Sequence, residues 1–82
     1  MSQQVEYDAE ADVLYLRITP GETVARTVPL DDLRLIDYSA DGAVVGLEFI
    51  DASEGIDLRD LPFARKAEQL LGDAGLNLTI YA

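Results

Sequence analysis

Apolar and polar residues alternate along several short segments of this chain, and a period of two residues is typical of β-strands. In one segment, residues 13–19, the side chains of Leu14, Leu16 and Ile18 share one face of the expected strand. In another segment, residues 44–51, Val45, Leu47 and Phe49 lie on one face and Glu48 lies on the other. The strands expected from this pattern are residues 4–8, 13–19, 23–28, 34–38 and 44–51.

The period changes after residue 60, where apolar residues recur at helical spacing. Pro62 suits the first turn of a helix, since its missing N–H has no intrahelical partner there. The apolar stripe of the expected helix is Phe63, Ala67, Leu70, Leu71 and Ala74. Residues 76–81 alternate again and predict a final strand. This strand could join the sheet of its own subunit or that of a neighbour, and the sequence leaves both arrangements open.

Short turns, such as Pro20-Gly21 and Asp41-Gly42, separate the strands, which favours antiparallel pairing. We therefore expect one α+β domain over residues 1–82. Its fold should be mainly an antiparallel β-sheet meander of five to six strands, with one helix near the C-terminus packed on one face. The second face would then be uncovered, and an apolar face of that size predicts a homodimer. Its apolar residues are Val13, Tyr15, Val44, Ile50 and Ile36.

Charge and composition narrow the classes of function. The 82 residues include 16 acidic and 6 basic side chains, for a net charge of −10, which disfavours binding to nucleic acid or to an anionic membrane. Cysteine and histidine are both absent, which excludes disulfides, thiolate metal sites and the usual general base. No apolar run approaches the 18 residues of a membrane-spanning helix, and the N-terminus lacks a signal pattern, so we expect a soluble cytoplasmic protein. We expect no cofactor.

Residues 37–48 satisfy the spacing of a calcium-binding EF-hand loop. Oxygen-bearing side chains and a glycine stand at the required places, namely Asp37, Ser39, Asp41, Gly42 and Glu48. An EF-hand loop lies between two helices, whereas both flanks here alternate as strands do. We therefore interpret the segment as a β-hairpin and keep the metal site as the alternative.

Four carboxylates also occur within seven residues, at Glu6, Asp8, Glu10 and Asp12. They could hold a divalent cation or act as a paired acid and base. The simpler interpretation is that Asp8 and Asp12 accept hydrogen bonds from backbone amides and shape a turn, while Glu6 and Glu10 are solvated.

Glu48 is a single charge within an apolar strand. If its face is buried in an interface, the carboxylate needs a partner such as Arg17, Arg34 or a tyrosine hydroxyl. The alternatives are a ligand-binding carboxylate and a solvated side chain. Tyr15 and Arg17 share a face and could meet Glu48 across strands.

Two segments together resemble a known family. Residues 7–17 (YDAEADVLYLR) and residues 37–53, with an Asp-Gly turn, Val-Val-Gly-Leu-Glu and a closing Asp-Ala-Ser, are similar to the domain of unknown function 2283 family of small prokaryotic proteins. The resemblance covers residues 5–53 and implies no established activity. Family members are suspected to act as antitoxin-like partners of small basic toxins.

The sequence thus predicts a non-catalytic protein-interaction module that binds a basic protein partner through acidic surface and an apolar sheet face. A divalent-cation-binding protein or a small carboxylate-based enzyme is the alternative. The residues expected in an interface or functional site are Tyr7, Asp8, Asp12, Tyr15, Arg17 and Glu48.

Overall fold

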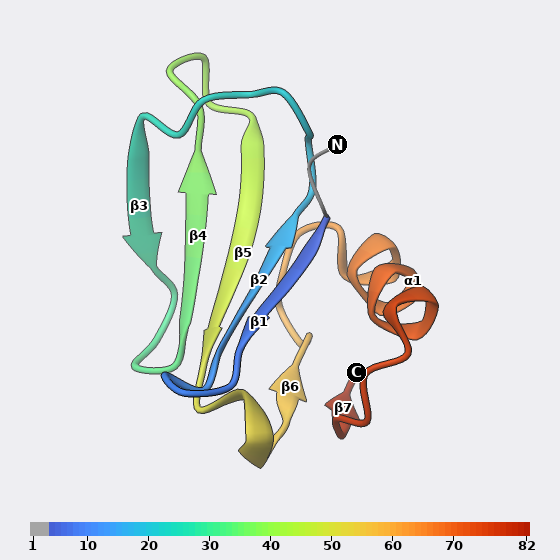
Figure 1. Ribbon diagram of the computed structural model, residues 1–82. Coiled ribbons are helices and arrows are strands. Elements are labelled where there is room, and N and C mark those ends of the chain that lie inside the picture. Colours follow the sequence, from blue (N-terminus) through green and yellow to red (C-terminus); the bar gives the residue numbers. More distant parts are fainter. Residues whose placement is uncertain (1–3) are drawn as a thin grey trace.

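The computed structural model describes residues 4–82 and contains a five-stranded antiparallel sheet with one α-helix on one of its faces (Figure 1). The sheet consists of β1 (Val5–Asp8), β2 (Val13–Arg17), β3 (Arg26–Pro29), β4 (Arg34–Tyr38) and β5 (Val44–Ile50). The remaining elements are a 3-10 turn (Ala52–Glu54), β6 (Ile56–Asp57), α1 (Ala64–Ala74) and β7 (Ile80–Tyr81). The predicted α+β class, the antiparallel sheet and the C-terminal helix are confirmed.

The strand order is β1-β2-β5-β4-β3. After β2 the chain crosses to the far edge of the sheet, and the hairpins β3-β4 and β4-β5 bring it back beside β2. The two strands with the strongest apolar faces, β2 and β5, are therefore neighbours at the centre. Leu14 pairs with Phe49 and Leu16 pairs with Leu47, and all four side chains are buried.

The core lies between the sheet and the layer formed by α1 and the chain from β6 to β7. Ala67 and Leu71 are the buried residues of the helix, and Lys66 fixes it to β2 with a hydrogen bond of 2.5 Å from Nζ to the carbonyl oxygen of Ile18. The sequence placed Ile36 and Val44 on the uncovered face, and this was wrong. Ile36 pairs with Leu47 and is buried in the core, while Val44 is half-buried and packs against the same cluster.

The C-terminal segment differs from the expected six-residue strand. Only Ile80–Tyr81 is a strand, and it pairs in parallel with β6 of the same chain in a separate two-stranded sheet. The backbone N–H of Ile56 donates to Thr79 at 2.7 Å, and that of Leu58 donates to Tyr81 at 2.7 Å. Within the structure described here, the last strand therefore pairs inside its own subunit.

Helix α1 begins at Ala64, two residues after Pro62. Phe63 adopts a left-handed conformation with φ of 58°, which breaks the helical path and leaves its side chain 54% exposed. Its expected place in the apolar stripe was wrong for this reason. Gly75, with φ of 70°, ends the helix. No helix of residues 4–82 is long and apolar enough to span a membrane.

Candidate functional site

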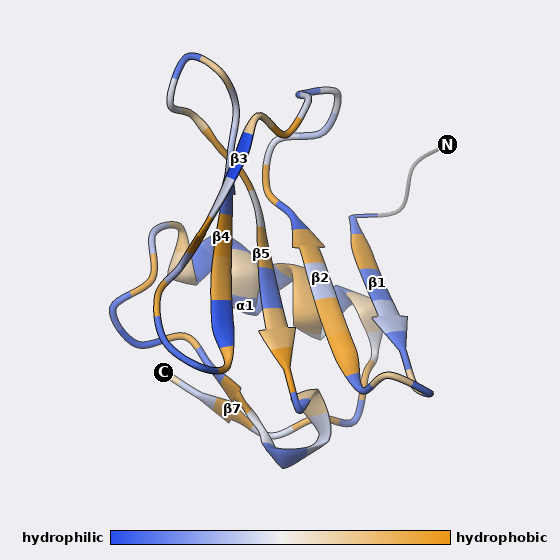
Figure 2. Ribbon diagram, turned by 90° about the vertical axis from the view of Figure 1, so that its left-hand side faces the viewer, coloured by the Kyte–Doolittle hydropathy of each residue, from blue (hydrophilic) through white to orange (hydrophobic). Residues whose placement is uncertain are grey.

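The sheet face opposite α1 is not covered by any element of the described chain, and it faces the viewer in Figure 2. We call it the outer face. Strand register places its side chains in three rows that cross the sheet from β1 towards β3. The rows are Asp8, Val13, Ile50 and Leu33; then Glu6, Tyr15, Glu48, Leu35 and Pro29; then Arg17, Gly46, Asp37 and Thr27.

The first row is apolar across its centre. Val13 and Ile50 are half-buried, and Leu33 is 46% exposed. Leu35 of the second row is also half-buried and extends this apolar surface towards β3. At the other side of the sheet, on β1, the same rows end in the exposed carboxylates of Glu6 and Asp8. The outer face therefore has an apolar patch along its first row and an acidic edge on β1, with Glu48 in the row beside the patch.

Tyr15 reaches across β5 to β4, and Gly46 makes this possible. A Cβ atom at Gly46 would overlap the Tyr15 hydroxyl and would stand 2.8 Å from the carbonyl oxygen of Leu16. The Tyr15 hydroxyl bonds to Asp37, whose Oδ1 also accepts a hydrogen bond of 2.5 Å from Thr27 Oγ1. Burial, and then the hydrogen bond to the Asp37 carboxylate, raises the pKa of Tyr15 to about 12.

Arg17 lies beside this network. Its guanidinium carbon stands 5.4 Å from the centre of the Tyr15 ring, and its Nη2 is 3.8 Å from Glu6 Oε1. Among the described residues its Nε is buried without a hydrogen-bond partner. The positive charge of Arg17 is thus held on the outer face near Tyr15 and only loosely paired with Glu6.

Glu48 was expected to pair with Arg17, Arg34 or a tyrosine hydroxyl if its face is buried in an interface. It lies opposite Tyr15 and Leu35 on the outer face and is half-buried, and no ion pair to it is found within residues 4–82. Arg34 occupies the other face, because it pairs with Phe49, and its guanidinium binds Asp31 at 2.7 Å. An ion pair between Glu48 and a second subunit stays a prediction.

Asp12 joins the two segments that carry the family resemblance. Its Oδ1 accepts hydrogen bonds from the Tyr7 hydroxyl at 2.7 Å and from the Ser53 N–H at 2.9 Å, and its Oδ2 accepts one from Ser53 Oγ at 2.6 Å. Asp12 has a left-handed backbone with φ of 56°. The bonds from Ser53 and Tyr7 lower the pKa of Asp12. The Asp12 carboxylate thus links the β1-β2 turn to the 3-10 turn that follows β5, and we call these contacts of Tyr7, Asp12 and Ser53 the Tyr-Asp-Ser latch.

Asp8 shapes the β1-β2 turn. Its Oδ1 accepts hydrogen bonds of 3.1 Å from the N–H groups of Glu10 and Ala11. Glu6 and Glu10 are exposed. This geometry favours the simpler interpretation of the acidic cluster, in which Asp8 and Asp12 accept hydrogen bonds from backbone amides and Glu10 is solvated, while Glu6 also stands 3.8 Å from Arg17.

The side chains that match the spacing of a calcium-binding loop do not converge on one point in the structure. Asp37 bonds to Thr27 on the neighbouring strand, and Ser39 and Asp41 bond to each other within the β4-β5 turn. Glu48 lies several residues along β5. Gly42, with φ of 89°, closes the turn. No group of three or more histidine, cysteine, aspartate or glutamate residues suited to a metal ion occurs in the described part of the chain.

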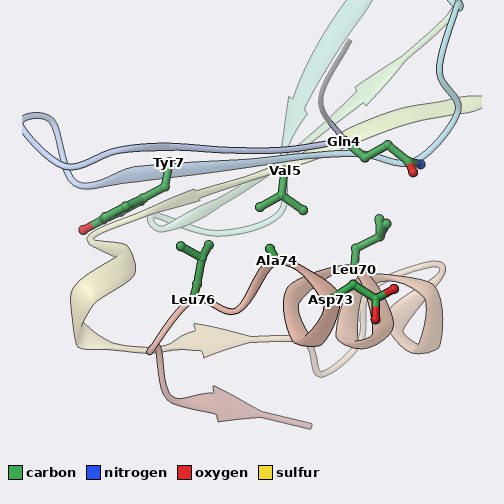
Figure 3. A pocket seen from close by; sticks show the side chains of 7 residues that line it. All are labelled: Gln4, Val5, Tyr7, Leu70, Asp73, Ala74 and Leu76. Atoms are coloured by element: carbon green, nitrogen blue, oxygen red, sulfur yellow. The ribbon is translucent and has the colours of Figure 1, made fainter. Parts of the chain in front are cut away.

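A groove of about 480 Å³ lies under the free edge of β1, between this strand and the helix (Figure 3). Val5 and Tyr7 of β1 form one wall, and residues of α1 and of the chain after it form the other. The lining residues are Gln4, Val5, Tyr7, Leu70, Asp73, Ala74 and Leu76. Its lining is polar and apolar in nearly equal parts, with one carboxylate, that of Asp73, at its side.

Sequence reasoning found Tyr7, Asp12 and Tyr15 as candidates but missed Gly46 and Ser53. Both missed residues lie in residues 37–53, the second segment that resembles the family, and this resemblance could have pointed to them. The groove was missed for another reason. It forms between residues that are about 65 positions apart, and alternation within a strand does not report such a contact.

The fold and the site define a small α+β domain with one covered and one uncovered sheet face, built around a Tyr-Asp-Ser latch. A family model described as "Protein of unknown function (DUF2283)" matches residues 4–53, which is more than half of the chain. The chain belongs to this family, and its resemblance to that family is confirmed. No match was found among curated proteins or among solved structures.

Proposed function

We propose that this protein is a non-catalytic interaction module that binds a basic polypeptide at the β1 side of its sheet. The observation that carries the proposal is the combination of surfaces at this side. Exposed Glu6 and Asp8 lie at the β1 end of the outer face, next to half-exposed Val13, and a partly apolar groove lies below the same strand. Apolar area beside single-sign charge is suited to a partner of opposite charge.

The net charge of −10 supports this choice of partner. A negatively charged protein attracts cationic polypeptides at distances shorter than the Debye length, beyond which salt screens the attraction. An antitoxin-like protein that neutralises a basic toxin would be one form of such binding. The acidic edge on β1 would then meet lysine and arginine side chains of the partner.

The carboxylates do not favour the alternative of a carboxylate-based enzyme. A general acid at neutral pH needs a raised pKa, which usually comes from burial. Here hydrogen bonds lower the pKa of Asp12, Asp41 and Asp57, the last of them to about 2. Each of these groups is thereby held in its ionised form as a structural acceptor.

The experiment is calorimetric titration with a capped peptide of about seven residues in which lysine and valine alternate. A matching peptide with glutamate in place of lysine is the charge control. We expect the lysine peptide to bind and the affinity to fall as salt is raised. The glutamate peptide should show no heat of binding.

The protein variant for this experiment is Glu6→Gln, which removes one exposed charge at the β1 edge. It should weaken binding of the lysine peptide by about two- to fivefold. Glu68→Gln makes the same charge change on an exposed part of α1 and should leave the affinity unchanged. Absence of binding, or equal binding of the two peptides, would contradict the proposed function.

A further inference from the structure

The five-stranded sheet has two edge strands, β1 and β3, and the structure treats them differently. The N–H of Arg17 donates to the carbonyl oxygen of Gln4 at 2.7 Å, so this pair is hydrogen-bonded. Hydrogen-bonded and non-hydrogen-bonded pairs alternate along an antiparallel ladder. Val5 and Tyr7 therefore point their N–H and C=O groups away from β2, to an edge that pairs with no other strand of residues 4–82.

Edge β3 is protected against pairing with a further strand. Leu30 N–H donates to Arg34 at 2.8 Å, so the same alternation turns Thr27 and Pro29 outward. Pro29 has no N–H to offer, and proline on an edge strand is a common device against strand addition. Edge β1 has no proline within its four residues, so all of its N–H groups are present.

The side chains of the two outward-facing residues of β1 also line the groove. Figure 3 shows Val5 pointing from β1 towards Leu70 and Ala74, whereas the Tyr7 ring runs past Leu76 with its hydroxyl directed away from the helix. A strand added beside β1 would place every second side chain on this covered face, over the groove. Those side chains would contact apolar residues, and the intervening ones would lie on the outer face beside Glu6 and Asp8.

Charge decides between a second copy of this chain and a basic partner. In a symmetric antiparallel pair of β1 strands centred on Glu6, the two Glu6 carboxylates would stand directly opposite each other. A pair centred on Tyr7 would place Glu6 opposite Asp8. Like charges at opposed positions destabilise strand pairing. Lysine or arginine at the same positions would instead meet opposite charge.

We propose that β1 binds an extended segment of the basic partner as a sixth strand of the sheet, with apolar side chains in the groove and alternating basic side chains beside Glu6 and Asp8. This inference rests on the proposed function and adds the mode of binding. It predicts that the recognised segment alternates apolar and basic residues, since a strand has a period of two.

N-methylation of the probe tests this mode without changing the protein. Two versions of the lysine–valine peptide are needed, one methylated on the valine amides and one on the lysine amides. In an antiparallel addition the valine amides face β1, and in a parallel addition the lysine amides do. We expect one version to bind at least about tenfold more weakly than the unmodified peptide, while the other retains its affinity.

The two proposals fail in different ways in this experiment. Equal affinity of the two methylated peptides, whether retained or lost, would overturn strand addition and leave the binding of basic polypeptides standing. Absence of binding by the unmodified peptide would overturn both. The methylated peptide that keeps its affinity also shows the direction of the added strand: methylated lysine amides are tolerated in an antiparallel addition and methylated valine amides in a parallel one.

A protein variant gives a second, independent readout. Val5→Pro removes an outward N–H without removing a hydrogen bond to β2, as Pro29 does naturally on β3. This substitution should lower the affinity of the protein for the unmodified peptide at least about tenfold. Val5→Ala keeps the N–H and shortens the side chain, and it should weaken binding less. Equal affinities of Val5→Pro and the unchanged protein would overturn the proposal.

Discussion

At the scale of single residues, the position of the Tyr15 ring on the outer face requires that residue 46 be a glycine, which has no side chain. Tyr15 can bond to Asp37 on the second strand away because Gly46 lies between them without a Cβ atom. The sequence indicates Tyr15 as a candidate, yet a glycine within a strand is ordinarily unfavourable. The close approach of the Tyr15 ring supplies the physical reason for its presence.

The variant Gly46→Ala should lower the free energy of unfolding by about 1–3 kcal/mol, because the added methyl group overlaps Tyr15 and approaches the Leu16 carbonyl oxygen. Gly72→Ala is the matched control, since a Cβ there meets no atom within 4 Å and the residue lies within α1. Alanine should stabilise that helical position. Urea denaturation measures both, and an unchanged midpoint for Gly46→Ala would contradict the packing described for Tyr15.

Tyr15 should also make stability depend on pH at the alkaline end. Its pKa is about 12 in the folded protein against 10.0 for an ordinary tyrosine. Between these values the folded protein keeps a proton that the unfolded chain has released, so the free energy of unfolding falls as pH rises. Tyr15→Phe should show a smaller fall over this range. Equal pH dependence of the two proteins, with all tyrosines ionising near pH 10 by absorbance, would refute the assignment.

At the scale of elements, alternation in the sequence identified the five strands of the main sheet and the burial of Leu14 and Leu16 on β2 and of Leu47 and Phe49 on β5, but it misplaced Val44 and missed β6. It could not give the strand order. The crossover that places β5 beside β2 depends on contacts between segments distant in sequence, and short turns alone favour a simple meander. The alternation of Leu76, Leu78 and Ile80 was misleading, because an extended segment that packs on a core shows the same pattern without strand partners.

The connector before the helix is more important for stability than its sequence suggests. This segment, residues 53–60, is rich in acidic residues and shows no strand-like alternation, yet Ile56 is fully buried and pairs with Ile80. Ile56→Ala should therefore lower the free energy of unfolding by about 2–5 kcal/mol. Val24→Ala, at a residue that is 41% exposed, should change it by less than about 0.5 kcal/mol. Similar effects of the two variants in chemical denaturation would show that β6 is not part of the core.

At the scale of the whole molecule, the sheet is covered on one face and open on the other. The sequence predicted this asymmetry from the presence of one helix, and it is the feature on which the functional proposals depend. It predicted neither the groove nor the latch. Both form where the β1-β2 segment meets later parts of the chain, at residues such as Ser53 and Leu76.

The homodimer stays a prediction, and we propose the outer face for it, through the apolar surface of Val13, Leu33, Leu35 and Ile50. Light scattering during gel filtration should then give twice the chain mass of 9.0 kDa. Ile50→Lys should shift the mass towards the monomer, whereas Glu68→Lys on the helix should not. A mass near 9.0 kDa for the unchanged protein at all concentrations would contradict the dimer.

The central claim is that β1 receives a strand from a basic partner. Amide hydrogen exchange followed by nuclear magnetic resonance tests it most directly, because an edge amide exchanges readily until it gains a hydrogen-bond partner. With the lysine–valine peptide bound, the amides of Val5 and Tyr7 should exchange at least about tenfold more slowly, and Thr27 on β3 should be unaffected. Unchanged exchange at Val5 and Tyr7 with the peptide bound, or protection at Thr27 instead, would contradict the claim.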